Sequence, residues 1–100
     1  MEIKITREDG SVTVFLIGRM DTLASQECAP QMDALKEDAG GLIVLDCTEL
    51  SYISSSGLRI FLTLRKAAGE KGGRVVIRGI SDSIRSVFMI TGFLNLFEIE

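Results

Sequence analysis

The sequence predicts a small α/β fold with a mostly parallel sheet of four or five strands, an N-terminal hairpin and three or four helices. Two alternating stretches at the start are joined by Asp9-Gly10, a dipeptide typical of hairpins because both residues tolerate positive φ. Two short apolar runs, Leu42–Asp46 and Arg74–Arg78, lack polar interruption, as strands buried in a parallel sheet do. Segments of helical periodicity separate these strands, which implies right-handed crossovers with helices on both faces.

The first half of the chain predicts two strands and one long helix. Strands are expected over residues 2–6 and 11–17, and Gly18 is expected to close the second. Asp21 or Thr22 can cap a helix that reaches about residue 38. The expected inward face of this helix consists of Ala24, Cys28, Met32 and Leu35.

Two features bound that helix. Pro30 removes a backbone donor and clashes one turn back, so either the helix kinks there or its regular part begins near residue 29. Gly40-Gly41 then ends the helix before the buried strand.

The second half predicts a helix over residues 58–68, a strand and a third helix. Glycines at 69, 72 and 73 punctuate the exit of the first of these helices. Ser81-Asp82 is a capping pair that starts the last helix, and Gly92 stops it. Residues 97–100 alternate in character, which indicates an edge strand or a helical turn.

Composition indicates one cytoplasmic domain over residues 1–100. The chain has 46% hydrophobic and 25% charged residues, enough apolar side chains for one core. A net charge of −3 without a basic stripe argues against nucleic acid as a partner. No apolar run is long enough to insert in a membrane, and the N-terminus lacks a signal peptide. Cys28 and Cys47 have no paired spacing, so buried free thiols are expected.

The side chains present argue against an enzyme. The chain contains no histidine, which excludes Ser-His catalysis, imidazole proton transfer and histidine metal sites. The glycines around Lys71 fit an ordinary turn better than a nucleotide-binding loop. We therefore expect no cofactor, no metal and no catalytic residue.

A run of three serines, Ser54, Ser55 and Ser56, lies between the buried strand and the second helix. In open α/β sheets, ligands and partners bind beyond the carboxyl ends of the strands. The simpler interpretation is that one of these serines only caps the helix. The functional interpretation is that an exposed hydroxyl is offered to a kinase, and that its phosphate would lie beside free backbone N–H groups.

The helix after the serines suggests a docking surface. At 100° per residue, Ser55, Arg59, Leu62 and Lys66 fall in one stripe, with Leu58 and Leu62 at the edge of the inward arc. An apolar residue between two cations suits a partner with an acidic rim. The alternative, given equal weight, is that Leu62 belongs to the core and the two cations are its solvated neighbours.

The segment L-D-C-T-E-L-S-Y-I-S-S-S-G-L, residues 45–58, resembles the signature of the STAS family, the bacterial anti-sigma factor antagonists. On that pattern Asp46 matches a strand-end Asp that organises the loop. Ser55 matches the phosphorylated serine, and the hydroxyl residue and Gly-Leu pair of the family follow it. Weaker similarity covers residues 18–21 and 92–99. The chain departs from the family at Ser54, where an Asp is usual, and so lacks one carboxylate in this loop.

The resemblance implies an anti-sigma factor antagonist with a STAS-like fold. Unphosphorylated, it would bind an anti-sigma factor that is also a serine kinase; phosphorylation at Ser55 would end binding, and a serine phosphatase would restore it. Together with the stripe, it predicts as partner-binding residues Asp21, Ser54, Ser56, Gly57, Leu58, Arg59, Leu62 and Lys66. One alternative is an accessory subunit of a lipid-transport or other membrane-associated ATPase complex, without phosphorylation. A weaker alternative is a small acyl- or nucleotide-binding enzyme.

Overall fold

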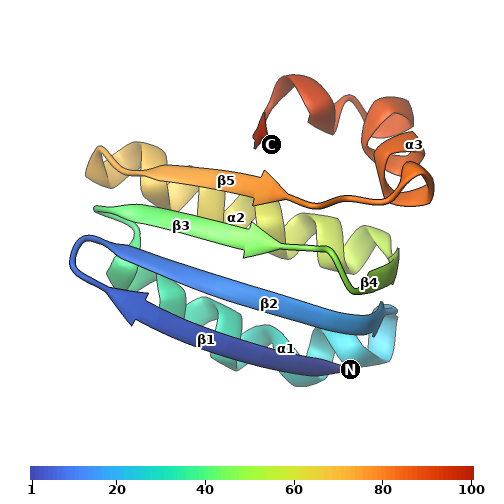
Figure 1. Cartoon of the computed structure of the whole chain (residues 1–100), viewed down its shortest axis with the longest axis horizontal. Helices are drawn as coiled ribbons and strands as arrows, with labels where there is room; N and C mark the ends of the chain where they lie inside the picture. Colours follow the sequence, from blue (N-terminus) through green and yellow to red (C-terminus); the bar gives the residue numbers. More distant parts are fainter.

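The computed structural model describes residues 1–100 and contains six strands, three α-helices and two short 3-10 helices (Figure 1). In chain order these are β1 (Glu2–Glu8), β2 (Ser11–Met20), α1 (Thr22–Ala34), η1 (Leu35–Asp38), β3 (Leu42–Asp46), β4 (Leu50–Ile53), α2 (Ser55–Lys71), β5 (Arg74–Arg78), α3 (Asp82–Thr91), η2 (Phe93–Asn95) and β6 (Glu98–Ile99).

The sheet has the order β1-β2-β3-β5-β6, and β4 pairs with the far end of β2. The β1–β2 hairpin is antiparallel, and every other pairing is parallel. The predicted fold class and N-terminal hairpin are thus confirmed, and β6 shows that the tail forms an edge strand. The sheet has one strand more than the four or five expected.

Helices α1 and α2 lie side by side on the same face of the sheet, the one turned away in Figure 1. The expectation of helices on both faces is therefore wrong for these two. The strand order advances in one direction from β2 through β3 to β5. Right-handed crossovers in one direction place successive helices on one face; a helix on the other face would require the order to reverse.

The core lies between this helical layer and the sheet. Phe61, Leu64 and Ala68 form the buried face of α2, while Met32 and Leu35 are buried from the first helix and η1. Of the inward residues expected for α1, Ala24 is only half-buried, and Ser25 is buried in addition. Both cysteines are buried free thiols, as predicted.

Strand β2 continues past Gly18, so the prediction that this glycine closes the strand is wrong. Gly18 has φ +105° and the pairing register shifts between it and Arg19. The glycine therefore permits an irregularity that turns β2 from pairing with β3 to pairing with β4. The sequence prediction missed β4 because the strand has four residues, of which only Leu50 and Ile53 are buried.

The start of α1 agrees with the predicted cap at Asp21 or Thr22, whereas α2 differs from its predicted bounds. Helix α1 begins at Thr22 and continues through Pro30, so a regular helix starting near residue 29 is wrong. Helix α2 is longer than the expected 58–68: it begins at Ser55, continues through Gly69 and ends at Lys71, where Gly72 caps it with a φ of +77° that suits glycine.

Gly57 is required by the close approach of α2 to the strands. A Cβ at this position would lie 2.8 Å from Ile53 Cγ1 and 3.1 Å from Met20 Sδ. Both neighbours are buried core side chains that cannot withdraw into solvent. The first turn of α2 therefore lies at this distance from the sheet only with glycine at residue 57.

We predict that Gly57→Ala lowers the free energy of unfolding by about 1 to 3 kcal/mol, because the added methyl overpacks the core. Gly69→Ala is the matched control, since nothing lies within 4 Å of its added Cβ in the same helix. That control should raise stability by about 0.5 to 1 kcal/mol. Chemical denaturation of both variants checks this, and equal effects of the two substitutions would contradict the packing argument.

Candidate functional site

The three serines lie where β2 and β4 end and where α1 and α2 begin, at the right-hand side of Figure 1. The backbone N–H of Ser54 donates to the carbonyl of Met20 over 2.8 Å and so joins the start of α2 to the end of β2. Asp21 follows directly and caps α1, accepting from the N–H of Ala24 over 2.8 Å. The fold thus brings the predicted Asp21 and the serines to one end of the sheet.

Each serine has a different environment. Ser54 is only 7% exposed and is the N-cap of α2, where its Oγ accepts from the N–H of Gly57 over 3.2 Å. Ser55 is exposed, and its hydroxyl takes part in none of the hydrogen bonds of the structure; Ser56 is half-buried. Capping therefore accounts for Ser54 but leaves the Ser55 hydroxyl free at the surface.

The predicted stripe on α2 is exposed along its length. Leu62 retains 36% of its surface, so the alternative that it belongs to the core is wrong. The four ion pairs of the structure include neither Arg59 nor Lys66. Ser55 is thus followed along α2 by two cations without carboxylate partners and by one exposed apolar side chain.

Three residues predicted to bind a partner are buried. Leu58 retains only 5% of its surface and belongs to the core, so its expected place at the edge of the inward arc is wrong. Gly57 and Ser54 are also buried. Because the first turn of α2 packs closely on Met20 and Ile53, these residues support the exposed surface from beneath.

Asp46 fixes the loop that follows β3. Its carboxylate accepts from the N–H of Thr48 and from Arg78 Nε, each over 3.0 Å. Burial tends to raise the pKa of Asp46, but hydrogen bonds from Thr48 and the guanidinium of Arg78 outweigh it, so the pKa lies below its usual range. The adjacent Cys47 has a pKa raised to about 12, chiefly by burial and then by Asp46. That thiol is therefore a poor nucleophile.

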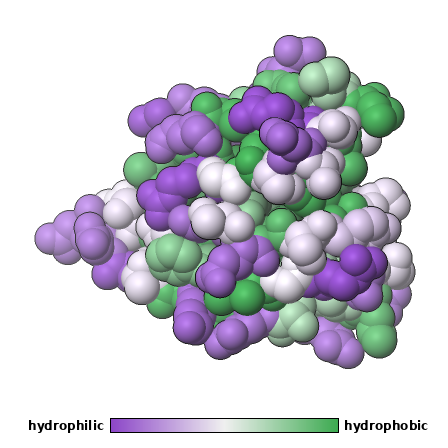
Figure 2. All heavy atoms as spheres, turned by 45° about the vertical axis from the view of Figure 1, so that its right-hand side comes forward, coloured by the Kyte–Doolittle hydropathy of each residue, from purple (hydrophilic) through white to green (hydrophobic).

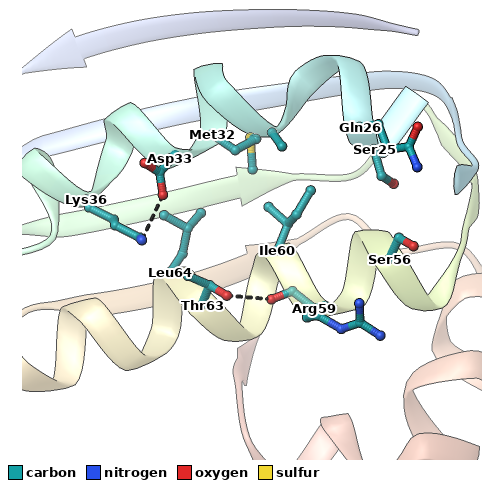
Figure 3. A pocket seen from close by; sticks show the side chains of 11 residues that line it. Ser25, Gln26, Met32, Asp33, Lys36, Ser56, Arg59, Ile60, Thr63 and Leu64 are labelled. Atoms are coloured by element: carbon teal, nitrogen blue, oxygen red, sulfur yellow. Dashed lines mark hydrogen bonds and ion pairs between the residues drawn. The ribbon is translucent and has the colours of Figure 1, made fainter. Parts of the chain in front are cut away.

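A cleft of about 350 Å³ lies between α1 and α2 (Figure 3). Arg59 and Ser56 from α2, with Ser25 and Gln26 from α1, lie at its end nearest the serine loop. The sequence prediction missed this cleft because the cleft depends on how α1 and α2 pack against each other. The half-buried side chain of Ile60 lines it.

A second feature absent from the prediction is a contact between the ends of β2 and β4. The Arg19 guanidinium lies over the Tyr52 ring, 4.5 Å from its centroid, and both residues are exposed. Pairing of β2 with β4 places them together, so the contact could not be found without predicting β4. Figure 2 shows that this side of the molecule mixes hydrophobic and hydrophilic residues.

No group of three or more Cys, Asp or Glu side chains could hold a metal ion. None of the helices has the length and apolar character needed to cross a membrane.

Comparison with known families identifies the domain. The model of the STAS domain matches residues 2–100. The chain belongs to the STAS domain family. One of its relatives is the anti-sigma-B factor antagonist of Listeria monocytogenes, which is 28% identical over 100 residues, covering all of this chain and 87% of the relative.

Solved structures confirm the STAS fold. The anti-sigma factor antagonist SpoIIAA in its unphosphorylated form matches with a TM-score of 0.76 at 18% identity, covering 99% of this chain and 87% of that one. The Bacillus SpoIIAA structure in the phosphorylated form matches with a TM-score of 0.75 at 19% identity, covering 99% and 91%. This STAS domain therefore has the same fold as SpoIIAA in either form.

Proposed function

We propose that this STAS domain is an anti-sigma factor antagonist whose activity is switched by phosphorylation of Ser55. The observation that carries the proposal is the free, exposed Ser55 hydroxyl at the first turn of α2. The anti-sigma-B factor antagonists of Listeria monocytogenes and Staphylococcus aureus support it, because the chain covers 87% and 93% of their lengths. The proposed site of action is the cytoplasm, where the partner is an anti-sigma factor with serine kinase activity.

Unphosphorylated, the domain binds this partner through the exposed stripe of α2. Leu62 supplies apolar surface, and Arg59 and Lys66 attract acidic side chains around it. Because these cations have no carboxylate partner in the free domain, binding does not require an existing ion pair to break. Asp21 and Ser56 lie at the same end of the molecule and extend this surface toward α1.

A phosphate on Ser55 acts at the centre of this surface. It adds roughly −1.5 to −2 charges beside N–H groups of the first turn that have no intrahelical partner. Arg59 lies one turn further along α2, in position to form a charge-assisted pair with the phosphate. The modification thus introduces negative charge and withdraws a cation from the partner at once.

The kinase supplies ATP and its metal ion, and a serine phosphatase restores the unmodified form. The domain itself is a binding protein and a substrate without catalytic residues. Raised pKa values of both buried thiols, caused mainly by burial, agree with this assignment because neither thiol is an activated nucleophile.

We predict that incubation with the cognate kinase and ATP adds one phosphate to Ser55. Ser55→Ala should abolish the modification. Ser56→Ala is the control, because it removes the neighbouring hydroxyl, and it should retain the modification. Peptide mapping by mass spectrometry checks the position. A phosphate on Ser54 or Ser56 would show that the register is wrong; a stable complex with a transporter ATPase and no phosphate would favour an accessory subunit instead.

We also predict that Arg59→Glu weakens binding to the anti-sigma factor by at least about tenfold, because it places like charges together at the interface. Thermal stability should change little, since exposed charges contribute at most about 1 kcal/mol. Lys4→Glu on β1 reverses the same charge away from α2 and should leave affinity unchanged. Equal loss of affinity in both variants would mean that net charge, not this surface, governs binding.

A further inference from the structure

Two buried serines, one in α1 and one at the cap of α2, lie next to each other beneath Ser55. Ser25 in the first turn of α1 is 1% exposed, Ser54 at the start of α2 is 7% exposed, and their Oγ atoms lie 3.4 Å apart. Buried hydroxyl groups require hydrogen-bond partners, and no polar side-chain atom of the buried interior lacks one.

The direction of the bond between these hydroxyls follows from their other partners. Ser25 Oγ lies 2.7 Å from the carbonyl oxygen of Asp21, which can only accept, so the single hydroxyl proton of Ser25 is used there. Ser54 must then donate to Ser25. Ser54 Oγ in turn accepts from the N–H of Gly57 over 3.2 Å.

The result is a directed chain from the Gly57 N–H through both hydroxyls to the Asp21 carbonyl. It joins the cap of α2 to the residue that caps α1, and bonds in such chains polarise and strengthen one another. A second bond, from Ser54 N–H to the Met20 carbonyl, holds the same residue through its backbone. Ser55 therefore follows a residue, Ser54, that is fixed through both its backbone and its side chain.

We propose that Ser25 is a positioning residue for Ser55: it fixes the rotamer of the Ser54 cap and with it the direction of the Ser55 hydroxyl. The functional part of this inference rests on the proposed role of Ser55. A carboxylate at residue 54 has no proton to donate. The Ser25 hydroxyl would therefore have to donate to that carboxylate instead of to the Asp21 carbonyl. With serine at residue 54, this chain of hydrogen bonds is uncharged and runs in one direction. Ser25 is the acceptor that the Ser54 hydroxyl needs.

The direct test is hydrogen exchange of the Gly57 amide in Ser25→Ala. Loss of one typical hydrogen bond should speed this exchange about two- to tenfold. The Ile84 amide is the internal reference, because Ser81 Oγ accepts from it over the same 3.2 Å at the start of α3. A general loss of stability would speed both amides together, whereas loss of positioning affects Gly57 alone.

Ser86→Ala is the matched control variant. Ser86 Oγ donates to the carbonyl four residues back, as Ser25 does, but it is exposed and supports no second hydroxyl. Exchange at the Gly57 and Ile84 amides should be unchanged in that variant. If Ser25→Ala fails to fold, Ser25→Cys keeps nearly the same volume with a much weaker hydrogen-bonding group, and it should show the same selective effect at Gly57.

The second readout is phosphorylation. In Ser25→Ala, kcat/KM of the kinase for this domain should fall about two- to tenfold, and Ser86→Ala should leave it unchanged. If the kinase does not modify the unaltered domain, the proposed function fails while Gly57 exchange still tests the hydroxyl chain. Unchanged Gly57 exchange in Ser25→Ala, or equal acceleration at Gly57 and Ile84, would overturn the inference.

Discussion

The first turn of α2 rests directly on the ends of β2 and β4, and the exposed surface of this domain depends on that contact. Gly57 allows the approach because its missing Cβ leaves room for Met20 and Ile53. The Ser54 N–H closes the contact on the Met20 carbonyl. These short-range contacts determine the axis of α2, so they also determine where the stripe of Ser55, Arg59 and Leu62 faces.

The same contact separates the structural and functional roles of adjacent residues. Ser54 and Leu58 point inward, as cap and as core, and the Ser55 hydroxyl remains free at the surface. A single serine would have to serve as both cap and acceptor, and its modification would then remove the cap. With two serines, the proposed phosphorylation of Ser55 leaves Ser54 free to hold the helix. For this reason we expect the proposed modification to leave the fold unchanged.

Much of this arrangement could be predicted from the sequence because it follows from local patterns. The hairpin at Asp9-Gly10, the buried strand before Asp46 and the stripe on α2 each depend on neighbouring residues or helical periodicity. The turn of β2 toward β4 depends on long-range pairing through Gly18, and a four-residue strand with two buried side chains carries little periodic signal. The Ser25–Ser54 contact and the cleft beside Ile60 depend on how α1 and α2 pack, which no local pattern encodes.

The central claim is that phosphate on Ser55 blocks the partner directly and does not refold the domain. Its most direct test compares the domain phosphorylated at Ser55 with the unmodified form, by titration against the anti-sigma factor and by thermal melting. Affinity should fall by orders of magnitude, because burying the phosphate dianion at the interface, or placing it against acidic side chains, costs several kcal/mol. The melting temperature should hold or rise slightly, since negative charge at a helix N-terminus is favourable by about 0.3 to 1 kcal/mol. A sharp drop in melting temperature or a loss of helical circular dichroism would instead show that the switch works by local unfolding.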